Sequence, residues 1–257
     1  MGDSSNSGMP FVEIGVSDLG RAEAFYGELL ELPRLAGEVD AVGRPMRRMG
    51  REDGHVRLVQ LGADAHATDW ERNDLQCGIR HFGLKVADID AWIDRLERAG
   101  VSIVAGPFDA FGGVRIAFFF DPDGAYLELV QGYVQHNRLL SASLSGEEVE
   151  GDRDWDGRPR FDHVAVSVPD LDDALRVYRD RFGFGVIGQL VRPEEERGFL
   201  ITNLRAAPGT LEVFSFDAPT YERGEDDGTE RLGLRAIGVR GLAEPGTGAG
   251  GVRLLPG

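Results

Sequence analysis

The 257-residue chain contains a single cysteine, Cys77, and no hydrophobic run long enough to cross a membrane. One cysteine excludes an internal disulfide and is typical of proteins from a reducing compartment, so we expect a cytoplasmic protein. A transmembrane helix needs about 20 consecutive apolar residues, and its absence from the sequence predicts that no membrane is involved. The N-terminus, MGDSSNSGMP, is polar and lacks the apolar core of a signal peptide.

Positive charge is also scarce. Lys and Arg number 28 against 44 Asp and Glu, which gives a formal net charge of −16. This balance argues against nucleic acid or an anionic membrane as a partner. A hydrophobic fraction of 42% is typical of a globular protein, and the length allows one large domain or two ordinary ones. We therefore expect a protein that acts on a small molecule.

Three segments share one pattern, in which a short alternating strand leads through an aspartate into an amphipathic helix. They are FVEIGVSDLGRAEAFYGELL (11–30), HFGLKVADIDAWIDRLERAG (81–100) and HVAVSVPDLDDALRVYRDRFG (163–183). Asp18, Asp88 and Asp170 are good helix N-caps. Further candidate strands follow each helix, so each unit is predicted to be a β-α-β-β-β module. A fourth unit begins at 232–241, but no helix follows it in the sequence.

These repeats predict an α+β fold of tandem βαβββ modules that form cupped mixed sheets, with the fourth module truncated. The predicted boundaries are a disordered tail at 1–9, a first domain at 10–134 with modules at 10–62 and 79–134, an acidic linker at 135–159, and a second domain at 160–257 with a full module at 160–217 and a truncated one at 230–257. The linker is expected at the surface because it is acidic and rich in Ser and Gly. The acidic clusters at 194–196 and 225–227 are predicted to be solvated loops.

One glutamate stands out in FFFDPDGAYLELVQ, which predicts two apolar strands around a turn. Pro122 presets φ for that turn and Gly124 accepts a positive φ, so the two aspartates beside them are interpreted as turn formers rather than calcium ligands. Glu128 interrupts the second strand. A carboxylate buried there without a partner would cost several kcal/mol. It therefore either reaches solvent or acts as a metal ligand or general base.

The pattern resembles the vicinal oxygen chelate superfamily, which includes glyoxalase I, extradiol ring-cleaving dioxygenases, methylmalonyl-CoA epimerase and bleomycin-resistance proteins. The resemblance covers residues 11 to about 241, and its most specific parts are the strand–Asp–helix starts and DPDGAYLEL. In that family paired modules form a cup around a metal, with ligands from the first and last strands of each module. The resemblance implies one divalent ion (Zn, Ni, Co, Fe or Mn) held by His81, Glu128, His163 and Glu212.

The implied ligands are unevenly distributed, because all four lie in modules two and three. Module one has Phe11 and Arg57 at the matching positions, and module four has Ala236 at the first and no convincing residue at the second. A fusion of two dimeric glyoxalase chains would pair module two with three and one with four, leaving one complete site and one dead site. If modules one and two pair instead, Glu13 is an alternative ligand.

The leading functional hypothesis is a metal-dependent lyase or isomerase resembling glyoxalase I or an epimerase. The metal would act as a Lewis acid on two neighbouring substrate oxygens, and Glu128 or Glu212 would be the base that forms an enediolate. Lys85 and Arg115 are candidate contacts for a substrate anion, or ordinary surface charges. The protein is expected to be a monomer or a homodimer.

Two alternatives remain open. An extradiol-type dioxygenase would need Fe(II) held by two histidines and one carboxylate, which His81, His163 and Glu212 provide, but Glu128 would then crowd the open positions. A metal-free protein that binds an antibiotic or another aromatic ligand would instead use an apolar cup lined by Phe11 and its neighbours.

Overall fold

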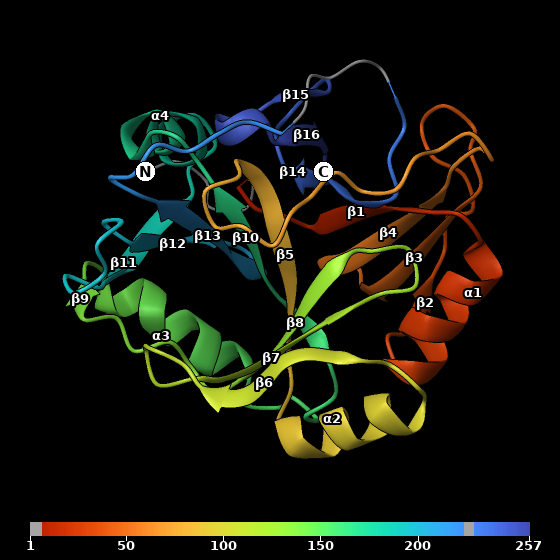
Figure 1. Cartoon of the computed structure of the whole chain (residues 1–257), viewed down its shortest axis with the longest axis horizontal. Helices are drawn as coiled ribbons and strands as arrows, with labels where there is room; N and C mark the ends of the chain where they lie inside the picture. The colour runs from red at the N-terminus through yellow and green to blue at the C-terminus, as the bar shows by residue number, and fades with distance from the viewer. Residues whose placement is uncertain (1–6, 224–228) are drawn as a thin grey trace.

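The computed structural model describes residues 7–223 and 229–257, which form two mixed sheets with helices packed on them (Figure 1). The nine-stranded sheet has the order β6 (Ile103–Asp109), β7 (Arg115–Phe120), β8 (Tyr126–Gln131), β5 (Gly78–Lys85), β10 (Arg160–Ser167), β13 (Gly209–Ser215), β12 (Leu200–Ala206), β11 (Gly185–Val191) and β9 (Arg138–Leu139). The seven-stranded sheet has the order β15 (Gly246–Thr247), β16 (Arg253–Pro256), β14 (Gly233–Val239), β1 (Phe11–Val16), β4 (Gly54–Gln60), β3 (Met46–Arg51) and β2 (Arg34–Leu35). The predicted α+β class of tandem modules is confirmed.

Each module helix begins where the sequence predicts. The helices are α1 (Leu19–Glu23) with its π-helical continuation η2 (Ala24–Leu29), α2 (Ile89–Arg98), α3 (Ala142–Gly151), α4 (Leu171–Leu175) with its π-helical continuation η3 (Arg176–Arg181), and the short 3₁₀ turn η4 (Ala249–Gly251). The side chains of Asp18, Asp88 and Asp170 each accept a hydrogen bond from a backbone N–H in the first turn of their helix. The three predicted N-caps are therefore confirmed.

The four modules pair across the chain rather than along it. β5 of module two runs antiparallel to β10 of module three, and β1 of module one runs antiparallel to β14 of module four. One sheet therefore belongs to modules two and three and the other to modules one and four. Module four contains β14, β15, η4 and β16, so within the described residues β14 leads to no helix comparable to those of the other modules.

The segment predicted as a surface linker has structure of its own. It contains β9 and α3, and Figure 1 shows α3 beside β11 at one side of the nine-stranded sheet. α3 has no fully buried side chain, and ion pairs hold it, among them Arg205 with Glu147 at 3.2 Å and Arg160 with Glu148 at 3.3 Å. An acidic, Ser-rich sequence can thus form a helix here because the strands beneath supply cations to its acidic face.

At the N-terminus, Met9 of the predicted tail is buried and its N–H donates to the carbonyl of Ala206 at 3.0 Å. Residues 1–6 of that tail and the acidic cluster at 225–227 lie outside the described residues. In the other acidic cluster, Glu194 and Glu196 are exposed in a loop. No helix in the described part of the chain combines the length and apolarity needed to cross a bilayer.

The DPDG turn after β7 also joins two modules. The carboxylate of Asp121 accepts hydrogen bonds from the N–H groups of Asp123 and Ala125, at 2.9 and 2.7 Å, as expected of a turn former. It also accepts a hydrogen bond of 2.8 Å from the hydroxyl of Tyr26 in module one. The turn therefore fixes the end of β8, which carries Glu128, against the neighbouring module.

Candidate metal centre

The strand register brings the four candidate ligands together. In the antiparallel β5–β10 pair Ala165 lies opposite His81 and Gly83 lies opposite His163. In the flanking parallel pairs, Glu128 lies opposite Gly83 and Glu212 lies opposite Ala165. Because side chains two residues apart share a face of a strand, all four project from the same face at the centre of the sheet.

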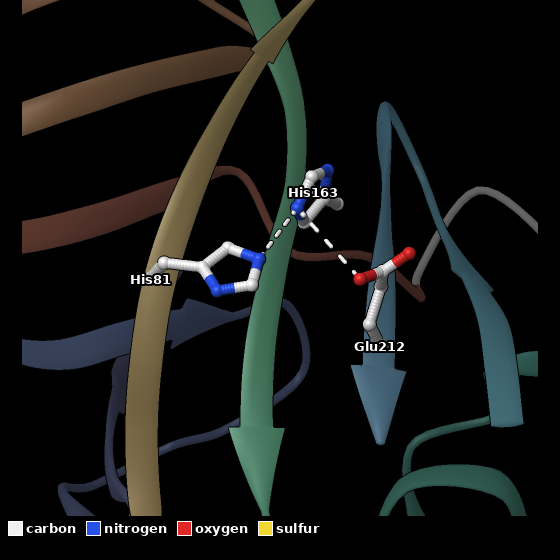
Figure 2. Close-up of side chains that lie close together, drawn as sticks. All are labelled: His81, His163 and Glu212. Carbon is white, nitrogen blue, oxygen red and sulfur yellow. Dashed lines mark hydrogen bonds and ion pairs between the residues drawn. The ribbon is translucent and has the colours of Figure 1, made fainter. Parts of the chain in front are cut away.

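The distances between the donor atoms are those of a compact cluster. The Nε2 atoms of His81 and His163 are 3.0 Å apart (Figure 2), and the Oε2 atom of Glu128 lies 2.8 Å from the first and 3.3 Å from the second. The Oε2 atom of Glu212 is 3.8 Å from Nε2 of His163. Two nitrogens that each lie about 2.0–2.1 Å from one ion are about 3 Å apart, so the two imidazoles fit a single divalent ion. The donor atoms of His81, His163 and Glu212 all lie within 4.8 Å of one another, and Glu128 adjoins this group through its contacts with both histidines.

The electrostatics of the cluster suit a cation. Burial by itself would raise the pKa of Glu128, but His81 and His163 hold it at about 2. Burial lowers the pKa of His81, whereas for His163 the effect of burial is overcome by Glu212, Asp162 and Glu128, which raise its pKa well above the usual value. The two carboxylates would balance the charge of a divalent ion that replaces the proton on His163.

Two further side chains support the ligands. Asp162 contacts Nδ1 of His163 at 2.9 Å, which leaves Nε2 to face the cluster, and Asn203 donates from Nδ2 to Oε1 of Glu212 at 3.1 Å. Sequence reasoning missed both residues. Asp162 precedes His163 directly, and strict alternation would place it on the opposite face, but the β5–β10 register shifts between Phe161 and His163, so a bulge turns it toward the ligand.

The two predicted anion contacts lie elsewhere. Lys85 is buried, forms an ion pair with Glu148 of α3, and lies 3.4 Å from Oδ1 of Asp162. Lys85 therefore contacts His163 only indirectly, through Asp162. Arg115 forms an ion pair of 2.7 Å with Asp90 of α2, outside the cluster. The structure thus brings Lys85 close to the site, through Asp162, and leaves Arg115 at the surface.

Gly83 leaves the space that the ring of His163 fills. A methyl group added at Gly83 would overlap this imidazole. We expect Gly83→Ala to displace His163 and to lower the affinity for a divalent ion by at least about 10- to 100-fold, the range seen when a ligand loses its orientation. Isothermal titration with Zn²⁺ measures this.

Gly146→Ala is the matched control, because a methyl group there meets no atom within 4 Å. It should leave the zinc affinity unchanged and, in the middle of α3, add up to about 1 kcal/mol of stability. Wild-type affinity in Gly83→Ala would show that the ring of His163 is not held against this glycine.

The corresponding positions of the other sheet carry no such ligand set among the described residues. In the metal-site sheet, each glutamate lies opposite the residue two positions after a histidine. In the other sheet, Glu13 stands two positions after Phe11 and lies opposite Arg57, and Gly238 stands two positions after Ala236 and lies opposite Leu255. Leu255 is therefore the module-four equivalent that the sequence did not reveal. Phe11, Ala236 and Leu255 form a buried apolar cluster.

The region around Phe11, where an apolar cup is predicted, is filled by buried side chains that include charged groups. The guanidinium of Arg57 lies 3.5 Å from the centre of the Phe11 ring. Glu13 is buried nearby, and burial raises its pKa although Arg235 and Arg57 oppose the shift. Glu13 lies in a different sheet from His81, so the alternative in which it completes a site between modules one and two is wrong.

His55, whose ring lies 5.6 Å from that of Phe11, predicts a pH effect on stability. Burial, followed by the charges of Arg48 and Arg57, lowers its pKa from 6.5 to about 4. Between these two values the folded state binds fewer protons than the unfolded state, so acidification through this window lowers the free energy of unfolding, by about 2–3 kcal/mol for this group. Denaturant unfolding at pH 7.5 and pH 4.5 should show a smaller difference in His55→Gln than in wild type. Equal differences would contradict the assignment.

Comparison with known proteins agrees with this architecture. Residues 8–129 and 160–250 match the family model for the Glyoxalase/Bleomycin resistance protein/Dioxygenase superfamily. The chain belongs to this superfamily, as the resemblance of its modules predicts.

The relatives include proteins named as lyases. A probable chloroplastic lactoylglutathione lyase of Arabidopsis thaliana is 24% identical over 213 residues, covering 81% of this chain and 52% of that protein, so the chain spans about half its length. A probable lactoylglutathione lyase of Vibrio parahaemolyticus is 30% identical over 146 residues, covering 55% of this chain and 99% of that protein. The crystal structure of glyoxalase I from Zea mays aligns with a TM-score of 0.67 at 17% identity, covering 97% of this chain and 92% of that one, and shows the shared fold.

Proposed function

We propose that the protein is a metal-dependent lyase or isomerase of the glyoxalase type that acts on a small carbonyl compound. The observation that carries this proposal is the convergence of two buried imidazoles and two carboxylates from four adjacent strands. His81, His163, Glu128 and Glu212 would hold one divalent ion. When bound, the ion would supply Lewis-acid polarisation of two neighbouring substrate oxygens.

The contacts favour different roles for the two glutamates. Glu128 touches both histidines, at 2.8 and 3.3 Å, and is therefore assigned as a ligand. Glu212 approaches only His163, at 3.8 Å, and accepts a hydrogen bond from Asn203, so its carboxylate is freer to move. Glu212 would remove the proton from the hydroxyl-bearing carbon beside the carbonyl and return it to the former carbonyl carbon. The hydroxyl proton would pass to the former carbonyl oxygen, so the C–H and C=O groups exchange places with no net oxidation.

Exchange of carbon-bound protons with solvent tests this proposal. The protein, reconstituted separately with Zn²⁺, Ni²⁺ or Co²⁺, is incubated in D₂O with hydroxyacetone, 2-hydroxyacetophenone or the hemithioacetal of methylglyoxal and glutathione. ¹H NMR should show loss of the signal from the C–H beside the carbonyl in at least one compound, and only with metal. Metal binding without exchange in any of the three would overturn the proposal. Oxygen uptake with Fe²⁺ and catechol would identify the dioxygenase alternative instead.

A further inference from the structure

A cavity of about 410 Å³ opens onto the ligand cluster and contains His81, Glu128 and Glu212 in its lining. Its walls come from both modules, because the β6–β7 hairpin belongs to module two and the β11–β12 hairpin to module three. Five phenylalanines line it: Phe108, Phe111, Phe118, Phe199 and Phe214. The space available to a substrate beside the candidate metal site is therefore largely apolar, with five aromatic rings among aliphatic side chains.

Two of these rings, Phe118 and Phe214, lie edge-on to His81. The centroid of His81 lies 5.5 Å from Phe118 and 6.3 Å from Phe214, both edge-on, and Phe199 lies edge-on to Phe214 at 5.7 Å. Aromatic rings gain most from such edge-to-face and offset contacts, about 4.5–7 Å between centroids. A planar ring bound beside His81 would extend this arrangement.

The cations near the cavity already have partners. Arg80 lies over the Phe214 ring at 4.3 Å and pairs with Asp74 at 2.6 Å. Arg192 lies 5.6 Å from the Phe111 and Phe199 rings and pairs with Glu194 at 3.4 Å. Both guanidinium groups thus continue the aromatic walls, and Arg80, which is the more buried of the two, is held by Asp74.

The other half of the cup is covered. Beneath α3 lies a cavity of only about 80 Å³, lined by Lys85, Glu148, Asp162 and their neighbours. Lys85, the cation there, is paired with Glu148. A glutathione adduct carries two carboxylates and an ammonium group on a flexible peptide. It would have to displace these ion pairs to bind on either side of the cluster, whereas an uncharged ring would not.

From these contacts we infer the substrate class of the proposed site, an inference that rests on the proposed function. The substrate is a compact molecule in which an aromatic ring adjoins the two neighbouring oxygens, and it is taken without a peptide thiol cofactor. The ring lies among the phenylalanines, and the oxygens face His81, Glu128 and Glu212.

The proton-exchange assay on the metal-loaded protein tests the inference through the ratio of two substrates. We expect kcat/KM for 2-hydroxyacetophenone to exceed that for hydroxyacetone by about 10- to 100-fold. This factor corresponds to the free energy gained when one aromatic ring is removed from water. Phe111→Ala should reduce this ratio by about three- to tenfold, because the substrate ring loses one of the side chains that bury it. Phe111 is 45% exposed, so its removal is expected to leave the fold intact. Leu139→Ala, at a residue 50% exposed on β9, is the control and should retain the wild-type ratio.

The assay separates a wrong substrate class from a wrong reaction. Exchange of hydroxyacetone at or above the rate of 2-hydroxyacetophenone, or exchange of the glutathione hemithioacetal alone, would overturn the inference and leave the proposed function standing. If no compound exchanges, the proposed function fails. Calorimetric binding of 2-hydroxyacetophenone and hydroxyacetone to the metal-loaded protein then decides the ring preference, and equal affinities would overturn it.

Discussion

Replacing both His81 and His163 with alanine is expected to reduce the metal content from about one divalent ion per chain to almost none. Both side chains project from the central β5–β10 pair, and their Nε2 atoms are only 3.0 Å apart, so one ion would contact both. Removing them leaves two carboxylates, which bind Zn²⁺, Ni²⁺ or Co²⁺ more weakly than a mixed imidazole and carboxylate set. Plasma mass spectrometry on protein purified without a His-tag measures the change.

The experiment needs controls for folding and for adventitious metal. His66→Ala removes an exposed histidine from the segment between modules one and two and should retain the wild-type metal content. The His81→Gln/His163→Gln pair preserves side-chain volume and should lose the metal while keeping the circular dichroism and melting temperature of a folded chain. Metal-free wild type after reconstitution with Fe(II), Ni, Co and Zn, or full metal in a folded double variant, would disprove the site.

Glu212→Gln is expected to keep the metal and to lower kcat by about 10²–10⁴-fold, the usual contribution of a general base. Glutamine preserves the shape of the side chain but cannot accept the substrate proton. Glu128→Gln should behave differently, because Glu128 contacts both histidines and its carboxylate is held ionised, with a pKa of about 2. We expect this variant to lose metal affinity first and activity as a consequence.

Metal titration and turnover measured on the same samples separate the two roles. Excess metal should restore activity to Glu128→Gln and fail to restore it to Glu212→Gln. The exposed Glu244 offers a matched control, since Glu244→Gln should change neither quantity. Rescue of Glu212→Gln by metal, or an unchanged kcat in that variant, would reverse or remove the assignment of the base.

The recurrence of one pattern made much of this architecture predictable. Three strands that end in an N-capping aspartate locate the module helices, and histidines at the same distance before two of these aspartates indicate a shared function. His81, Glu128, His163 and Glu212 lie together as the module pairing requires. Their roles as ligands and base remain predictions.

The parts that sequence did not predict depend on local departures from regular structure. Asp162 reaches His163 through a bulge that breaks the alternation of β10. α3 has no apolar stripe by which a sequence pattern could identify it. Ion pairs of its acidic face with Arg205, Arg160 and Lys85 hold it instead. Leu255 is recognisable only from the parallel register of β14 and β16, because module four has lost the helix that marks the others.

The crossed pairing of modules restricts how this chain can recombine with its relatives. A crossover within 135–159 would join one parent's modules one and two to the other's modules three and four. Both antiparallel ladders, β5–β10 and β1–β14, would then join strands of different parentage. Such a hybrid would inherit His81 and Glu128 from one lineage and His163 and Glu212 from the other. The two halves must therefore remain compatible with each other at both ladders and at the ligand cluster, although a surface segment separates them in the sequence.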